Sequence, residues 1–329
     1  MNINIILRFK TEIATLLSLQ NQPKIAVAVS GGSDSIALAL LLSKLLKNQN
    51  KELISITIDH GLRENSSSEA LEVSKILRKH GITHYIIPWT GEKPNANIQE
   101  KARLARYKLL TDYCKQHDIL YLATGHQQND QAENFLIRAD HGSGLYGLAG
   151  IPKITEFNKI KIIRPLLEFS KSELQEFLIN EGVEWIEDPS NQNERFTRVR
   201  FRKFLQKNPQ WITKLATLSK NLNRAKDCIE YMLEKYINEI VEFDINGCAS
   251  TELNSFNQLP QEMRFRMLAK ILQDIGGETK KARGERIERL IEKIAKGKDF
   301  KASTLAKCLI RRKKDLIVIT PEAHFKKQT

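Results

Sequence analysis

The chain has 329 residues, which favours two domains because single domains commonly contain roughly 100–200 residues. Hydrophobic residues make up 41% and charged residues 28%, a composition that excludes a disordered chain, and no apolar run reaches the roughly 18 residues of a membrane helix. The net charge is +13, and residues 264–329 alone carry +11 (19 basic, 8 acidic). This imbalance favours a polyanionic partner such as nucleic acid, although a basic surface that only maintains solubility is the alternative.

The N-terminal segment and the cysteines both indicate the cellular compartment. The first 20 residues combine apolar and charged side chains without a cleavage site, which predicts an amphipathic helix and not a signal peptide. Four cysteines, at positions 114, 228, 248 and 308, form no CxxC pair, so neither a zinc knuckle nor a disulfide framework is expected. We therefore expect a cytoplasmic protein that does not contact a membrane.

The first part of the chain alternates short β-branched runs with helical patterns. Strands are expected at 24–29, 53–58, 84–89, 119–124 and 160–165. Helices are expected between them at about 34–47, 66–80, 97–116 and 129–139. This alternation predicts the α/β class, with a parallel, five-stranded, doubly wound sheet covered by helices on both faces.

The pattern changes near residue 208, where Asn208-Pro209 can end a helix because the residue before proline avoids the helical region. Helices are then expected at about 211–243, 260–275 and 282–296, followed by strand-like runs near 303–310 and 315–320. We expect two domains, one over 1–208 and a basic, mainly helical one with a small β tail over 209–329.

A glycine-rich loop connects the first expected strand to the first helix of the sheet. Its six residues are Ser30, Gly31, Gly32, Ser33, Asp34 and Ser35. Such a turn directs backbone N–H groups and the positive end of a helix towards an anion, which predicts a phosphate site. The Asp34 carboxylate would repel phosphate unless it holds magnesium, so we predict Asp34 as a metal ligand; the alternative is that Ser33 or Asp34 merely caps the helix. The loop matches neither GxxxxGK[ST] nor GxGxxG.

The loop resembles the pyrophosphate loop of the ATP pyrophosphatases, and further segments of residues 24–205 narrow the resemblance to the tRNA(Ile)-lysidine synthetase family. These segments are Asp59–Arg63, Asn97–Tyr107, Ala123–His126, Asp130–Glu133, Gly142–Gly144, Arg164–Leu166, Asp188–Asn191 and Arg198–Arg202. The resemblance implies a ligase that uses ATP to adenylate the wobble cytidine of tRNA(Ile) with a CAU anticodon. Free L-lysine then displaces AMP, giving lysidine. It also implies that 1–208 is the catalytic domain, and the net charge of +11 over residues 264–329 predicts that the domain over 209–329 binds tRNA.

Two histidine-containing segments follow expected strands, at the carboxyl edge of the sheet where ligands bind. Asp59 and His60 follow the second strand, and we predict that they contact the nucleotide, with His60 beside the adenine. His126 follows the fourth strand and is predicted to contact the α-phosphate. A purely structural role is the alternative for each histidine.

Charged pairs complete the predicted site. Asp130 and Glu133 are three residues apart on one helix face and require a cation, either magnesium or an ammonium group; the resemblance implies the ammonium of lysine. Arg106, with Arg103 beside it, matches the family's active-site arginine. The resemblance also places Arg198 near the reacting centre, within a basic and aromatic segment that suits RNA. Ordinary solvated helix faces are the alternative for these residues.

Two other functions remain open at this point. A tRNA thiolase of the same superfamily would need a persulfide-bearing cysteine or a cluster with paired thiols. A non-catalytic RNA-binding protein with a nucleotide-sensing domain would not need these acids and arginines beside the loop. The chain could also form a homodimer.

Overall fold

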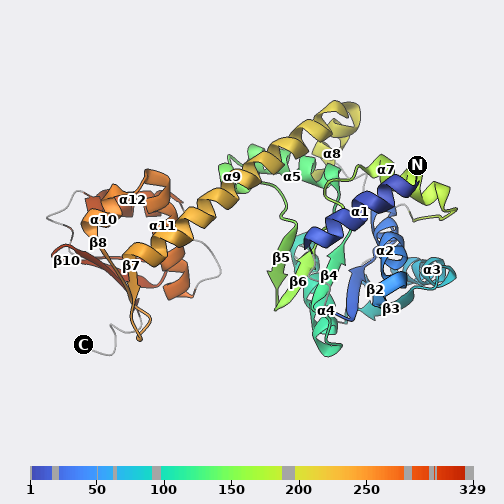
Figure 1. The fold of residues 1–329 in the computed structure, drawn as a ribbon, viewed down its shortest axis with the longest axis horizontal. Coiled ribbons are helices and arrows are strands. Elements are labelled where there is room, and N and C mark those ends of the chain that lie inside the picture. The colour runs from blue at the N-terminus through green and yellow to red at the C-terminus, as the bar shows by residue number, and fades with distance from the viewer. Residues whose placement is uncertain are drawn as a thin grey trace. The chain divides into compact units, whose positions relative to one another are not determined.

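The computed structural model describes residues 2–16, 22–49, 51–61, 65–90, 98–186, 197–277, 284–295, 300 and 302–322 (Figure 1). It divides into two compact units, Met1–Asn223 and Arg224–Thr329. The division falls inside one long helix, α9 (Gln210–Ile240), and not at the expected position after residue 208. The reason is that Ile212, Leu215 and Leu222 of α9 pack with apolar side chains of the first unit.

The first unit contains a six-stranded sheet with the order β3-β2-β1-β4-β6-β5. Its strands are β1 (Lys24–Ala28), β2 (Glu52–Asp59), β3 (Thr83–Pro88), β4 (Tyr121–Thr124), β5 (Ile154–Phe157) and β6 (Ile160–Ile163). All neighbours pair in parallel except β5, which is antiparallel to β6. The α/β class and the parallel core are confirmed, whereas the expected count of five strands omitted the edge strand β5.

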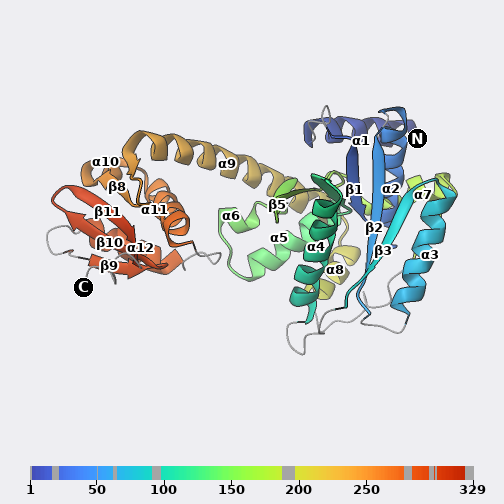
Figure 2. The same cartoon turned by 90° about the horizontal axis from the view of Figure 1, so that it is seen from below.

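Helices cover both faces of this sheet (Figure 2). They are α1 (Asn2–Leu16), α2 (Ser33–Leu46), η2 (Lys47–Gln49), α3 (Ser66–Lys79), α4 (Ile98–Gln116), α5 (Gln128–Asp140), α6 (Leu145–Leu148), α7 (Lys171–Asn180) and α8 (Thr197–Lys207). One core joins side chains of α1, α2, α3 and α7, such as Phe9, Leu38 and Phe177. A second core joins Leu110 and Cys114 of α4 to the opposite face. The central strands are therefore mostly apolar, and the hydroxyl groups of buried Ser55 and Thr57 on β2 donate to backbone carbonyls.

The strand order places the residues after β1 and β4 side by side. The chain moves from β1 to β2 and β3 in one direction, and β4 then pairs with β1 on its other side. This reversal is the position at which open α/β sheets bind ligands, at the carboxyl ends of the strands. The loop after β1 and the segment after β4 are both predicted site elements, so the fold brings them together.

The second unit combines the end of α9 with three helices and an antiparallel sheet of order β7-β8-β11-β10-β9. Its elements are β7 (Val241–Phe243), β8 (Ala249–Glu252), α10 (Leu253–Gln258), α11 (Gln261–Gly276), α12 (Gly284–Ala295), β9 (Ala302–Leu305), β10 (Cys308–Lys313) and β11 (Leu316–Pro321). The expected helices are present, but the expected β tail is a five-stranded sheet. Strands β7 and β8 are too short and polar to be recognised, and the expected run 303–310 is two strands, β9 and β10, separated by a turn in which Ala306 and Lys307 have positive φ. No helix in the described part of the chain is long and apolar enough to cross a membrane.

Candidate active site

The glycine-rich loop has the conformation that a phosphate cradle requires. Gly31 adopts φ +89°, and a Cβ atom there would lie 2.9 Å from Cγ2 of Val73. Gly32 is the N-cap of α2 and no side chain caps this helix end. Ser33 and Asp34 therefore lie in the first turn of the helix, and the alternative that either of them is the N-cap is wrong. The positive end of α2 is open to an anion.

Two serines brace the loop from within. The Ser35 hydroxyl accepts a hydrogen bond from the Ser30 amide at 3.1 Å and donates one to the Gly32 carbonyl at 3.0 Å. Ser35 is buried, so these bonds are shielded from water. The neighbouring Ser33 hydroxyl donates to Oδ1 of Asp34 at 3.2 Å. The Ser35 hydroxyl thus links the start of the loop to its glycines and holds the loop in shape.

Asp34 is a buried carboxylate beside a second acid. Burial, followed by the negative charge of Asp130, raises the pKa of Asp34 to about 6, against the smaller opposing effects of Lys171, Ser33 and Gln127. A nearby cation would stabilise the ionised form of this carboxylate. Within the described residues no cluster of three or more His, Cys, Asp or Glu could hold a metal by itself. Asp34 nevertheless fits magnesium, because magnesium usually takes only one or two protein carboxylates and completes its shell with phosphates and water.

In the segment after β2, the polar side chain of Asp59 makes hydrogen bonds mainly within the local turn. Oδ1 of Asp59 accepts a hydrogen bond from the Gly61 amide at 3.0 Å, and Oδ2 accepts one from the Ser67 hydroxyl at 2.5 Å. Burial opposes ionisation of Asp59, but the hydrogen bonds outweigh it and lower its pKa. The His60 ring packs edge-on against Trp89, with centroids 6.1 Å apart. These contacts favour a structural role for Asp59, and the nucleotide contacts of Asp59 and His60 stay predictions.

The segment after β4 lies directly on the start of α2. A Cβ atom on Gly125 would approach the Asp34 carbonyl carbon and the Ser35 amide nitrogen to 3.1 Å, so only glycine fits without displacing the loop. Next to it, Nδ1 of His126 lies 3.0 Å from the Thr124 hydroxyl. Burial, and then the positive charges of Arg164, Arg103, Arg106 and Arg198, lower the pKa of His126 to about 3. The imidazole is therefore neutral at physiological pH.

The arginines around His126 form a concentrated positive charge. The Arg103 and Arg106 guanidinium carbons lie 5.6 and 5.7 Å from the centroid of the Tyr107 ring. Burial, and the charges of Arg103 and Arg198, lower the pKa of Arg106 although Tyr107 opposes this. Arg164 is only 5% exposed and donates to the Pro152 carbonyl and the Thr155 hydroxyl, both neutral acceptors. Such a group of cations is an electrostatic site for an anion.

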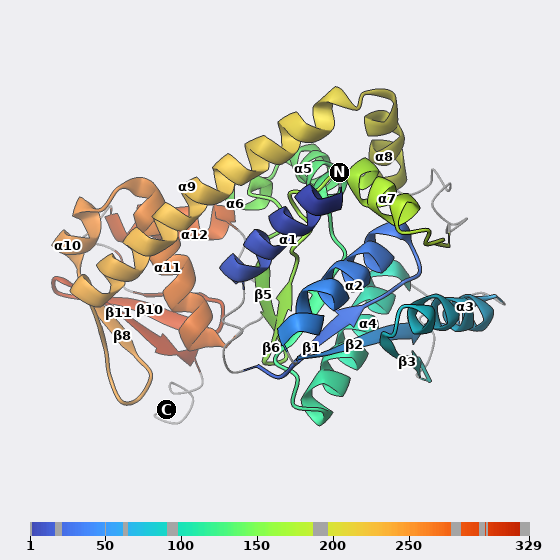
Figure 3. The same ribbon diagram turned by 45° about the vertical axis from the view of Figure 1, so that its right-hand side comes forward.

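Asp130 and Glu133 project from α5 and meet arginines from α8, which lies beside it (Figure 3). Arg198 donates from Nη2 to Asp130 Oδ1 at 2.6 Å and from Nε to Glu133 Oε2 at 2.7 Å. Arg202 donates from Nε to Glu133 Oε1 at 2.7 Å. The remaining oxygen of Asp130 accepts from the Gln127 amide at 2.9 Å in a capping box that begins α5. The two acids do face one cation, but here that cation is Arg198.

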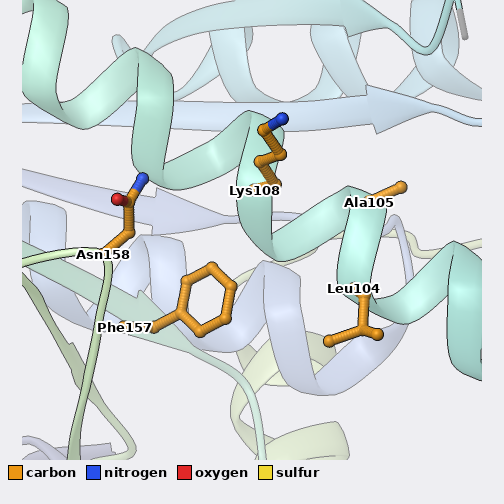
Figure 4. Close-up of a pocket in the computed structure, with 5 residues that line it drawn as sticks. All are labelled: Leu104, Ala105, Lys108, Phe157 and Asn158. Atoms are coloured by element: carbon orange, nitrogen blue, oxygen red, sulfur yellow. The ribbon is translucent and has the colours of Figure 1, made fainter. Parts of the chain in front are cut away.

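The structure thus brings Asp34, His126, Asp130, Glu133, Arg106 and Arg198 into one region, whereas Asp59 and His60 belong to a separate turn. Sequence reasoning missed the contributions of Arg164 and Arg202, although both lie in segments that carry the family resemblance. Residues 62–64, 91–97 and 187–196, which hold parts of the expected motifs, lie outside the described residues. A separate depression of about 470 Å³ is lined by Leu104, Ala105, Lys108, Phe157 and Asn158 and contains no predicted site residue (Figure 4).

Comparison with known proteins agrees with this geometry. Residues 5–209 match the PP-loop domain family, so the first unit is a PP-loop domain, a class that uses ATP. The chain is 35% identical over 316 residues to the tRNA(Ile)-lysidine synthase of Orientia tsutsugamushi (strain Boryong), covering 93% of this chain and 71% of that protein. It is 34% identical over 305 residues to the tRNA(Ile)-lysidine synthase of Wolbachia pipientis wMel, covering 91% and 71%. The chain belongs to the tRNA(Ile)-lysidine synthase family.

Comparison with a solved structure supports the fold but not the function. The U34-tRNA thiolase of Methanococcus maripaludis superposes with a TM-score of 0.57 over 67% of this chain and 80% of that chain, at 22% identity. At this level of identity the likeness shows a shared architecture and carries no argument about the reaction.

Proposed function

We propose that this protein ligates free L-lysine to the wobble cytidine of tRNA(Ile) with a CAU anticodon. The ring carbonyl oxygen of the cytidine attacks the α-phosphorus of ATP, and pyrophosphate leaves. An amine of lysine then attacks the activated ring carbon and loses a proton, while the carbon–oxygen bond breaks and AMP leaves. Adenylation converts a poor leaving oxygen into a good one, so the protein has chiefly to position substrates and neutralise charge.

One observation carries the proposal: a cluster of arginines around His126 and a pair of carboxylates, Asp130 and Glu133, adjoin the same glycine-rich loop. Arg106, Arg198 and neutral His126 suit the α-phosphate, and the loop with the start of α2 suits the β- and γ-phosphates. Asp130 and Glu133 suit an ammonium group of lysine. We assign magnesium to Asp34, where it would screen charge between phosphate oxygens and the carboxylate.

The second unit is proposed to bind the tRNA backbone. Residues 264–329 carry net +11, and Lys313 at the end of β10 and Lys314 in the turn to β11 are exposed cations. Arg312, which precedes them on β10, has its Nη2 3.9 Å from Oδ1 of Asp315, so one acid partly offsets the charge of this cluster. The cytoplasm is the proposed location, and a homodimer stays a prediction.

The thiolase alternative has less support. Cys114 is the one cysteine of the first unit; it is fully buried, and burial raises the pKa of its thiol to about 12. A thiol in this state is a poor nucleophile. The other cysteines, Cys228, Cys248 and Cys308, belong to the second unit.

The direct test incubates the full chain with magnesium-ATP, radiolabelled lysine and total bacterial tRNA. We expect label in RNA and stoichiometric release of pyrophosphate, both abolished by Asp34→Ala. Pyrophosphate release without lysine transfer would favour another nucleophile, such as a sulfur donor. Absence of pyrophosphate release under conditions where ATP and tRNA bind would favour the non-catalytic alternative.

A further inference from the structure

Two arginines on one helix contact the same pair of carboxylates, but they do so differently. Arg198 takes one oxygen of Asp130 and one of Glu133, and so bridges the two acids. Arg202, one helical turn later, contacts both oxygens of Glu133, through Nε to Oε1 at 2.7 Å and Nη2 to Oε2 at 3.3 Å. A fork of this kind matches a single carboxylate. The acids and arginines thus form a set of four groups with no net charge.

This arrangement conflicts with simple entry of a substrate ammonium. Glu133 is 3% exposed, and each of its oxygens already accepts a hydrogen bond from a guanidinium group. One oxygen of Asp130 accepts a hydrogen bond from Arg198, and the other accepts one from the backbone N–H of Gln127. An added ammonium would create excess positive charge in a partly buried site. It can bind between the acids only if Arg198 leaves, whereas Arg202 can stay on Glu133.

The side chain of Arg198 could also interact with an anion bound near His126 and Arg106. Its charge contributes to lowering the pKa of both His126 and Arg106, so it lies within electrostatic reach of the cationic region. A phosphate bound in that region would attract the guanidinium group of Arg198 and reduce its repulsion from Arg106. Occupation of the phosphate region and release of the two carboxylates are therefore linked through one side chain.

We propose that Arg198 occupies the substrate-ammonium site until nucleotide phosphate draws it away, and that Arg202 is the positioning residue that holds Glu133 in place throughout. The inference rests on the proposed function, because it takes lysine as the ammonium ligand. Its consequence is ordered use of substrates: lysine binds well only after ATP has bound. By linkage, lysine must tighten ATP binding by the same factor, and couplings between sites typically amount to roughly 5–150-fold.

The test measures equilibrium binding of labelled lysine to the full chain, with and without magnesium and a non-hydrolysable ATP analogue. For the wild type we expect the analogue to tighten lysine binding by roughly 5–150-fold. Arg198→Ala should bind lysine more tightly than the wild type without nucleotide, and the analogue should no longer help. Arg198→Met, which keeps side-chain bulk without charge, should behave in the same way. Removal of a merely structural or catalytic interaction would not tighten binding.

Arg202 needs separate variants and a matched control. Arg202→Ala should weaken lysine binding with the analogue present and raise KM for lysine more than it lowers kcat, and Arg202→Lys should restore part of the affinity. Arg200, on the same helix, is exposed and donates to the Thr197 hydroxyl, so Arg200→Ala should retain the wild-type lysine affinity and coupling.

Two results would overturn the inference, and they are distinguishable. If the wild type binds lysine with the analogue but Arg198→Ala and Arg198→Met bind it no tighter than the wild type without nucleotide, the competition is absent and the proposed function stands. If no form binds lysine although the ATP analogue binds, both the inference and lysine as the substrate fail.

Discussion

The ionised carboxylate of Asp34 is predicted to serve in adenylation, but its burial lowers the free energy of unfolding. In the folded chain burial and Asp130 raise its pKa to about 6, whereas the unfolded value is 3.8. Below pH 3.8 the group is protonated in both states and carries no penalty. As pH rises from 3.8 through 6, the unfolded chain loses its proton more readily, so the free energy of unfolding falls. At 1.36 kcal/mol per pH unit, the difference reaches at most about 3 kcal/mol above pH 7.

Asp34→Asn removes this ionisation and retains a group that can accept the Ser33 hydrogen bond. We expect the variant to unfold at higher urea concentration than the wild type at pH 8, by up to about 3 kcal/mol, and the gain to shrink towards zero near pH 4. Adenylation by the same variant should fall by roughly 10²–10³-fold, the usual effect of losing one electrostatic group. Urea titrations at pH 4, 6 and 8 with pyrophosphate release supply both numbers. A variant that is less stable at pH 8, or a difference that does not change with pH, would refute the reasoning.

Three other substitutions test separate parts of the account. Gly125→Ala places a methyl group 3.1 Å from the backbone of Asp34 and Ser35, so it should lower stability by about 1–3 kcal/mol and weaken ATP binding, measured by calorimetry; unchanged affinity for ATP would contradict the close approach. Asp130→Asn and Glu133→Gln should each raise the apparent KM for lysine by at least about tenfold while tRNA-dependent pyrophosphate release survives better, and equal loss of both half-reactions would instead indicate a shared magnesium site. Joint replacement of Lys313 and Lys314 by alanine should weaken tRNA binding and flatten its log–log salt dependence by roughly 0.7–0.9 for each phosphate that is no longer neutralised, and an unchanged slope in titrations at several salt concentrations would leave only a solubility role.

The parallel core could be predicted from the sequence because its signals are local. The run from Lys24 to Val29 is largely apolar and β-branched, and a glycine-rich turn and an apolar helix follow it. This succession predicts a buried strand that leads through a tight turn into a helix. Since parallel strands share their carboxyl edge, proximity of the loop to His126 also follows without coordinates. The edge strand β5 could not be recognised, because Ile154 and Glu156 are exposed and the strand pairs on one side only.

The connections within the site depend on residues that are distant in the chain. Arg202 and Glu133 are separated by 69 positions, and no spacing rule predicts which guanidinium meets which carboxylate. The sequence indicated that Asp130 and Glu133 need a cation, but not that Arg198 would supply it. The pKa of Asp34 likewise depends on tertiary burial and on Asp130, which the sequence places 96 residues away. Local pattern therefore predicted which residues are candidates for the site, and tertiary packing determined how they interact.

The central claim is that one site joins lysine to the wobble cytidine at the expense of ATP. The most direct measurement uses two tRNA(Ile) transcripts that differ only in carrying cytidine or uridine at the wobble position. Each is incubated with the full chain, magnesium-ATP and isotopically labelled lysine, then digested to nucleosides for mass spectrometry while AMP and pyrophosphate are quantified. The account predicts one lysine on the wobble nucleoside of the cytidine transcript, with one AMP and one pyrophosphate released for each lysine, and none on the uridine transcript. Lysine attached elsewhere in the tRNA, or transfer without matching AMP release, would contradict it.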